Sequence, residues 1–281
     1  MESSVQPYLN EVAQLHPNGA PSLVSMILFG SGASGAFSQS SDVDLILVVP
    51  DETSQEDMTL LRSQVTELEI THGLRPPNTQ PKNPLVSFAE HAGGHVHSCF
   101  LCTRADLISG DVARIFSLRG AETIFVERMF LASVILSART VWGEDLLSLV
   151  PLPPLRRLDV FKSLFRSTSF TLFCAAAFPV LSGATMYAMS TLKHSLHSCY
   201  FCYHMKTAPL NDEVAFFNAR SGRDRTLQDL LNQRKEYHPS FAFVLRCVPT
   251  LFRMHLQTLR DNRFPRVVAR SPATGSAITT S

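Results

Sequence analysis

Two aspartates separated by one residue, Asp42 and Asp44, are the clearest candidates for chemistry in this sequence. They stand at the start of an apolar run, Val43 to Val49, that is short enough for a buried strand. Residues i and i+2 of a strand point to one face, so we expect both carboxylates on one face, with Val43 and Leu45 packed on the other. Two carboxylates held this close repel each other unless a cation lies between them. With oxygen ligands alone, that cation would be Mg²⁺ or Mn²⁺.

A glycine-rich stretch precedes the aspartates and places Gly30, Gly32 and Gly35 in the spacing G-x-G-x-x-G. A dinucleotide-binding fold needs these glycines to open a long helix, but the next strand begins at Val43 and leaves no room for it. A P-loop is excluded as well, because no Lys-Ser or Lys-Thr follows the glycines. Gly30 instead permits a close approach of the backbone to a phosphate, and Ser31 with the amides after it can donate hydrogen bonds to that phosphate.

The stretch GSGASGAFSQSSDVDL, residues 30–45, closely resembles the signature of the DNA polymerase β-like nucleotidyltransferase superfamily. That signature combines a Gly-Ser pair, a loop with a further glycine, and Ser-Asp-x-Asp-Leu, with a strand on either side. The segment TVWGEDLL, residues 140–147, resembles a segment that follows the long helix in small antibiotic-type members of the family. The overall plan is similar to kanamycin-type or minimal nucleotidyltransferases, which have a helical C-terminal half.

The resemblance implies the transfer of an NMP group from a nucleoside triphosphate to a hydroxyl acceptor, with release of pyrophosphate. It implies that Asp42 and Asp44 hold Mg²⁺ or Mn²⁺, and that Gly30, Ser31 and Ser41 bind the nucleotide. Two metal ions between such carboxylates would stabilise both the entering and the leaving oxygen. A small hydroxylated acceptor, such as an aminoglycoside-like antibiotic, fits the two-domain plan, and protein or RNA acceptors stay open.

The sequence departs from the family at the third carboxylate, which relatives carry on a later strand. The segment expected to form that strand reads HVHSCFLCT and contains neither Asp nor Glu. His97 or Ser98 would occupy the neighbourhood, while Glu90 and Asp106 stand at its margins. His97 could act as a general base, or it could be a histidine beside a sheet edge. A catalytically silent nucleotide-binding or antitoxin-like protein is therefore the alternative function.

Hydrophobic periodicity predicts the elements that must position these residues. Residues 22–29 and 43–49 read as buried strands, and residues 85–103 read as two strands joined by a glycine turn. Residues 5–15 and 52–70 have helical periodicity. The fold class that follows is an α/β (α+β) nucleotidyltransferase domain with a mixed sheet, followed by an all-α helical domain. We place the first at residues 1–110, the second at 111–265, and a disordered tail at 266–281.

The overall composition is that of an ordinary globular protein of 281 residues, with 45% hydrophobic residues and 25 Lys plus Arg against 24 Asp plus Glu. The formal charge of +1 gives no electrostatic argument for a general nucleic-acid binder. The N-terminus MESSVQPYLNEV lacks the pattern of a signal peptide, so we expect a cytoplasmic protein. The most apolar run, residues 170–189, is interrupted by Pro179 and Gly183, which favours a buried helix and a turn over a membrane span.

Six cysteines, four of them in two C-x-x-C pairs, raise the question of a zinc site. Cys99 and Cys102 would point to opposite faces of a strand, so we expect reduced thiols in the core instead. His194 and His197 share one face of a predicted helix, which a solvated or substrate-facing surface explains without a metal.

The helices of the C-terminal half carry more apolar surface than one small bundle buries, which predicts a homodimer and an acceptor cleft beside the helix of residues 192–206.

Overall fold

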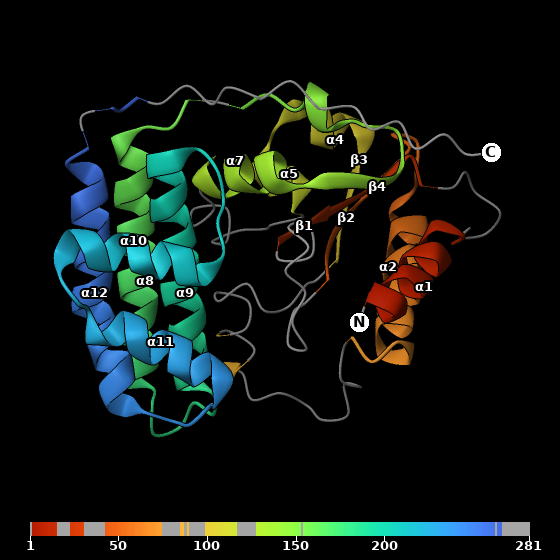
Figure 1. The fold of residues 1–281 in the computed structure, drawn as a ribbon. Helices are drawn as coiled ribbons and strands as arrows, with labels where there is room; N and C mark the ends of the chain where they lie inside the picture. The colour runs from red at the N-terminus through yellow and green to blue at the C-terminus, as the bar shows by residue number, and fades with distance from the viewer. Residues whose placement is uncertain are drawn as a thin grey trace.

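The computed structural model describes residues 2–15, 23–30, 43–74, 85–86, 89, 99–116, 128–152, 154–261 and 263–265. Figure 1 shows a sheet with helices on both faces and, beside it, a bundle of long helices. The elements are α1 Glu2–Ala13, β1 Ser25–Phe29, β2 Asp44–Val49, α2 Gln55–Thr71, β3 Cys99–Thr103, α4 Arg104–Ser109, α5 Val112–Ile115, α7 Arg128–Ser137, β4 Arg139–Gly143, the 3-10 helix η3 Leu147–Leu149, α8 Arg157–Ala176, α9 Ala184–His204, α10 Leu210–Ser221, α11 Arg225–Lys235 and α12 Phe241–Leu259.

The described strands form a four-stranded sheet in the order β3-β2-β1-β4. β1 pairs antiparallel with both β2 and β4, whereas β2 and β3 are parallel. β1 and β2 are almost entirely buried, as their unbroken apolar sequences predict, because helices cover both faces of the sheet. The mixed sheet and the helical region after it confirm the predicted fold class.

Side chains of the central strands alternate between two hydrophobic clusters. Leu45, Leu47 and Cys99 pack with α1 and α2 on one face. Ile46 and Cys102 pack with α5 and α7 on the other. The opposite orientation of the two cysteines is therefore confirmed, and all six thiols are buried and reduced. A disulfide or zinc role is not needed to explain their positions.

The sequence pattern was misread in two places. We expected helices from residue 111 onward, but β4 adds an edge strand to β1 with a register shift between Met26 and Ile27. The Thr, Val and Trp of β4 favour a strand when the edge of a sheet is available to pair with. The local sequence does not show that β1 provides such an edge. The first of the two strands expected within residues 85–103 is also wrong, because Leu85, Val86 and Ala89 are helical. The domain boundary at residue 110 stays a prediction.

The helical bundle is built around α9, which packs against α7, α8, α10, α11 and α12. The chain leaves α8 through a turn and enters α9 at Gly183, whose φ of 88° is left-handed. This confirms the predicted helix and turn in the most apolar run. In the part of the chain that the structure describes, no helix is both long and apolar enough to cross a membrane.

Polar contacts fix how α8 lies against its neighbours in the bundle. His255 of α12 lies 3.1 Å from the hydroxyl of Ser163 of α8 and 2.8 Å from the carbonyl oxygen of Leu251. Ser195 of α9 donates a hydrogen bond of 2.8 Å to Ser167 of α8. Because these groups are buried, the contacts of Ser163 with His255 and of Ser195 with Ser167 fix the register of helices that apolar packing alone would leave free to slide.

Candidate active site

Gly30 and Asp44 meet where β1 ends and β2 begins. The antiparallel register places Phe29 directly opposite Asp44, so Gly30 follows at the same end of the sheet. Gly30 has a left-handed φ of 68°, and a Cβ at this position would collide with Oδ2 of Asp44. The half-buried carboxylate thus occupies space that only a glycine leaves open. This closeness gives a physical reason for the glycine that the sequence alone did not supply.

The carboxylate of Asp44 lies on the opposite face of the sheet from Val43 and Leu45. Both apolar side chains belong to the cluster under α1 and α2, as predicted. Strand alternation then directs Asp44 toward the face that holds Ile46 and Phe29. The site therefore belongs to the α7 side of the sheet.

An aromatic cluster covers that face next to Asp44. Phe29, Phe100 and Phe116 pack with ring centroids 4.9 to 6.3 Å apart, and Phe130 of α7 lies 5.1 Å from Phe116. Phe29 and Phe116 are buried. Phe29 is the strand partner of Asp44, so the cluster begins directly beside the carboxylate. Electrostatic interactions are stronger where apolar groups exclude water. Sequence analysis missed this feature, because the four rings come from four separate elements.

Several predicted site residues lie outside the described residues: Ser31, Ser41, Asp42, Glu90, His97 and Ser98. Their assigned roles stay predictions. The parallel register pairs Leu45 with Cys99, so the described part of β3 begins one residue beyond the level of Asp44. Within the described chain, Gly30 and Asp44 are the predicted site residues that the fold brings together.

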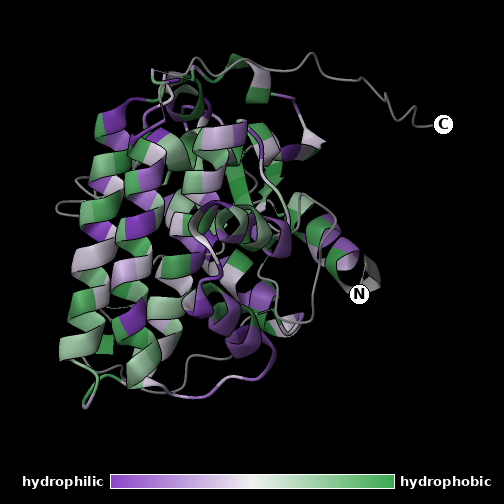
Figure 2. Cartoon of the chain, turned by 60° about the vertical axis from the view of Figure 1, so that its left-hand side comes forward, coloured by the Kyte–Doolittle hydropathy of each residue, from purple (hydrophilic) through white to green (hydrophobic). Residues whose placement is uncertain are grey.

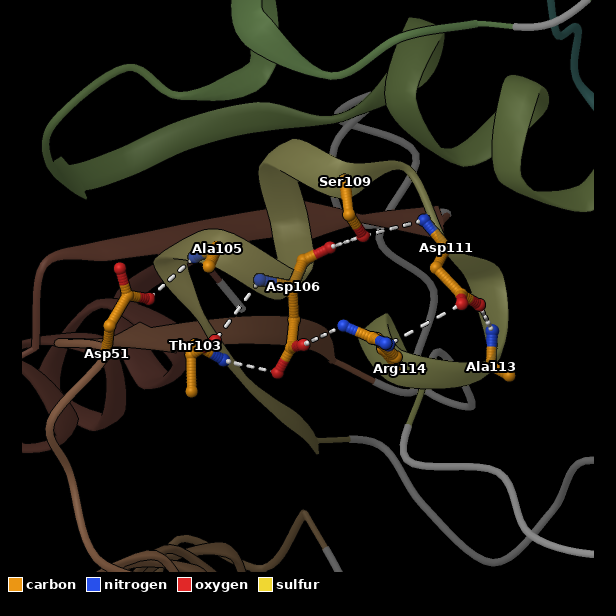
Figure 3. A network of polar contacts seen from close by, with 8 residues as sticks. All are labelled: Asp51, Thr103, Ala105, Asp106, Ser109, Asp111, Ala113 and Arg114. Atoms are coloured by element: carbon orange, nitrogen blue, oxygen red, sulfur yellow. Dashed lines mark hydrogen bonds and ion pairs between the residues drawn. The ribbon is translucent and has the colours of Figure 1, made fainter.

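Asp106, the other acidic candidate for the third carboxylate, is excluded by its position. It follows β3 at Thr103, which pairs with Val49, so the length of β2 separates it from Asp44 by about 16 Å. Its carboxylate accepts a hydrogen bond from the backbone N–H of Thr103 and closes a capping box at the start of α4. Figure 3 shows this network, in which Arg114 lies 3.8 Å from Asp106. Asp106 is a helix cap.

A buried carboxylate on α10 gives His197 of α9 a partner that the sequence did not reveal. Nδ1 of His197 lies 2.6 Å from Oε2 of Glu213, whose side chain is fully buried, while 34% of the His197 side chain is exposed. Burial raises the pKa of Glu213, and the nearby imidazole partly opposes that rise. Sequence spacing could not show this pair, because it depends on how α10 packs against α9. Among the described residues, no cluster with metal-ligand composition occurs.

Comparison with known proteins points to one kind of domain. Residues 7–88 match the family model of the nucleotidyltransferase domain, a range that contains both Gly30 and Asp44. The solved structure of spectinomycin adenyltransferase from Enterococcus faecialis, with ATP and spectinomycin, is similar to this chain with a TM-score of 0.52 and 11% sequence identity. The similarity covers 93% of this chain and 100% of that chain, so it includes the sheet and the helical bundle. No curated protein sequence matches the chain.

Proposed function

We propose that the chain transfers NMP from a nucleoside triphosphate to a hydroxyl acceptor and releases pyrophosphate. The premise is the match of residues 7–88 to the family model of the nucleotidyltransferase domain. The observation that carries the proposal is the glycine at the end of β1 held against the carboxylate at the start of β2. This is the part of the signature that needs both a close backbone approach and an acidic group.

A divalent metal fits the residues present. Asp44 offers carboxylate oxygen, the ligand type that Mg²⁺ and Mn²⁺ prefer, and the missing side chain of Gly30 makes the room in which Oδ2 lies. We propose that Asp42 and Asp44 hold the metal, which when bound would neutralise phosphate charge and polarise the α-phosphate. Gly30, Ser31 and Ser41 would contact the triphosphate.

In the proposed reaction, an acceptor hydroxyl attacks the α-phosphorus in line with the bond to the β-phosphate oxygen. The new O–P bond forms as that bond breaks, pyrophosphate leaves, and the hydroxyl proton passes to a base, for which His97 is our candidate. The aromatic cluster beside Asp44 would limit water at the reacting phosphate, which disfavours hydrolysis of the triphosphate.

The acceptor we propose is a small hydroxylated molecule that binds between the sheet and α9. α7 packs against both β1 and α9, and Figure 1 shows α9 on the side of the bundle nearest the sheet. The structurally similar enzyme was solved with ATP and spectinomycin, a small molecule, and this favours small acceptors over protein or RNA. We also propose that the protein is a homodimer and acts in the cytoplasm.

The test measures pyrophosphate release and the mass of the modified acceptor, with each nucleoside triphosphate and a panel that includes spectinomycin and aminoglycosides. Asp44→Asn should lower the rate at least about 100-fold, the size expected when one stabilising group is removed. Asp106→Asn is the matched control, because it alters a carboxylate at the start of α4, beside the end of β2 that is far from Asp44. A chelator should abolish both transfer and triphosphate binding in calorimetry.

Two results would contradict the proposal in different ways. Equal rates for Asp44→Asn and the native protein would remove the metal role of Asp44. Metal-dependent triphosphate binding without transfer to any acceptor or to water would instead favour the catalytically silent alternative.

A further inference from the structure

The outer sides of α8 and α12 carry large apolar side chains that the bundle does not bury. They are exposed to between 42% and 64%, and they are Leu158, Phe161, Phe165, Leu172, Phe241, Leu245, Phe252 and Leu256. We call these eight residues the α8/α12 face. Their spacings of three, four and seven residues keep them on one side of each helix, opposite the residues that pack on α9.

The two rows form one continuous surface because α8 and α12 are antiparallel neighbours. His255 contacts Ser163, and Arg157 at the start of α8 donates a hydrogen bond to the carbonyl oxygen of Asp261, just beyond the end of α12. Counting from the first contact, Phe165 lies within about one residue of the level of Phe252. Figure 2, which brings this side of the bundle forward, shows hydrophobic residues recurring along its helices.

The size of the face matches one half of a stable protein interface. A phenylalanine presents about 200 Å² and a leucine somewhat less, so four phenylalanines and four leucines that are about half exposed leave on the order of 700 Å² of apolar surface in water. The largest apolar patch of a typical monomer is about 300–600 Å². Each partner of a standard interface contributes about 800 Å². We infer that the α8/α12 face is the surface through which two copies of this chain form a twofold dimer.

The charges around the face agree with a second copy in one particular orientation. α12 has no acidic residue between Phe241 and Leu259, and the acidic residue of α8, Asp159, is buried. Arg157 and Arg260 lie at one end of the face, and exposed Lys162 stands beside its middle. Arg253, next to Phe252, and Arg246, toward the other end, are paired with Asp224 and Asp229, each at 2.8 Å. A twofold axis across the helices keeps the two cation-rich ends apart, while both apolar rows remain in contact.

This assignment rests on the proposed homodimer and is independent of the proposed transfer reaction, because its measurement is molecular mass. Sedimentation equilibrium of the full chain should give twice 31.1 kDa. Phe165→Glu and Phe252→Glu should each raise the dimer dissociation constant at least about 100-fold, as expected at the centre of an interface. Leu149→Glu is the control, because Leu149 is 51% exposed on the 3-10 helix and lies outside the face.

Three outcomes would overturn the inference. A native protein that stays monomeric at every concentration removes the dimer and the face together. A dimer that both glutamate variants leave intact places the interface elsewhere. Sedimentation of the monomer with vesicles of phosphatidylserine and phosphatidylcholine, lost in Phe165→Glu and weakened by salt, would assign the face to an anionic lipid surface instead.

Discussion

Gly30 shows how a single residue connects backbone conformation to the proposed chemistry. Its left-handed φ turns the chain away from β1, and its missing side chain makes room for the carboxylate of Asp44. The left-handed φ and the space for the carboxylate both favour glycine, but a larger residue would affect the two in different ways. Backbone strain affects stability, whereas displacement of the carboxylate affects the site.

Gly30→Ala should separate these two effects. The left-handed backbone costs about 1–2 kcal/mol for a residue with a Cβ, and the new methyl must push Oδ2 of Asp44 aside. Gly73→Ala is the matched control, since Gly73 has a φ of 69° and nothing within 4 Å of an added Cβ. We expect both variants to lose a similar amount of unfolding free energy. Only Gly30→Ala should also lose NMP transfer, at least about 100-fold. Equal activity of the two variants would show that the contact does not matter for transfer.

His197→Ala tests whether the imidazole stabilises the buried carboxylate of Glu213. Loss of the imidazole leaves the carboxylate buried without its hydrogen-bond partner, and a loss of about 2 kcal/mol in unfolding free energy is expected, within the range for a buried group left unsatisfied. Burial raises the folded pKa of Glu213, so stability is kept at low pH and lost as the pH rises through that pKa. The variant should therefore be less stable at pH 8 than at pH 5, relative to the native protein. Adding Glu213→Gln to His197→Ala should recover most of the lost unfolding free energy. If the loss in His197→Ala did not depend on pH, the buried carboxylate would not be its cause.

At the scale of elements, the antiparallel pair α8 and α12 is held by a histidine without charge. Burial lowers the pKa of His255 to about 4, and the hydrogen bond to Leu251 only partly opposes this effect. The neutral ring links the two helices through Ser163. The buried ring stays neutral in the folded protein. The free energy of unfolding is therefore highest at pH values where the histidine of the unfolded chain is neutral as well.

The pH dependence of stability should therefore carry the signature of His255. As the pH falls from the unfolded pKa of 6.5 toward about 4, the unfolded state binds a proton that the folded state does not, so stability falls by up to about 3 kcal/mol. Chemical unfolding of the native protein and of His255→Gln at pH 7.5 and pH 5 measures this. The glutamine variant should be less stable at pH 7.5 but should lose less on acidification. Parallel curves for the two proteins would assign the acid sensitivity to other groups.

At the scale of the whole molecule, the helix α7 shares a hydrophobic cluster with the bundle. Met129 and Ala132 of α7 are buried against Phe201 and Cys202 of α9, and Val160 of α8 completes the contact. α7 also packs against β1. The bundle therefore covers apolar surface of the sheet-bearing half, as well as offering a wall for the proposed acceptor site.

Deletion of the chain from Leu152 onward should expose that surface. We expect residues 1–151 to aggregate in light scattering and to bind triphosphate poorly, because Met129 and Ala132 lose the side chains that cover them. Co-expression with residues 152–281 as a separate chain is the control, since it can restore the contact without the covalent link. A soluble fragment that still modifies the acceptor would show that the bundle contributes nothing to the acceptor site.

The sequence by itself determined the features that depend on neighbouring residues. The apolar run after Asp42 predicted β2 because a strand buried on both faces needs an unbroken apolar sequence, and the glycines with the Asp-x-Asp pair predicted the site. The break at Pro179 to Gly183 predicted the turn between α8 and α9 for the same local reason.

Only the tertiary structure decided the features that depend on distant segments. Asp106 had a plausible place in the sequence, but the parallel pairing of β3 with β2 carries it to the far end of the sheet. β4 became a strand because β1 offered an edge, and Glu213 met His197 because α10 packs on α9. In the sequence, the exposed apolar residues of the α8/α12 face cannot be distinguished from core residues. Hydrophobic periodicity shows which face of a helix or strand is apolar. Which other segment packs on that face depends on contacts between segments far apart in the chain.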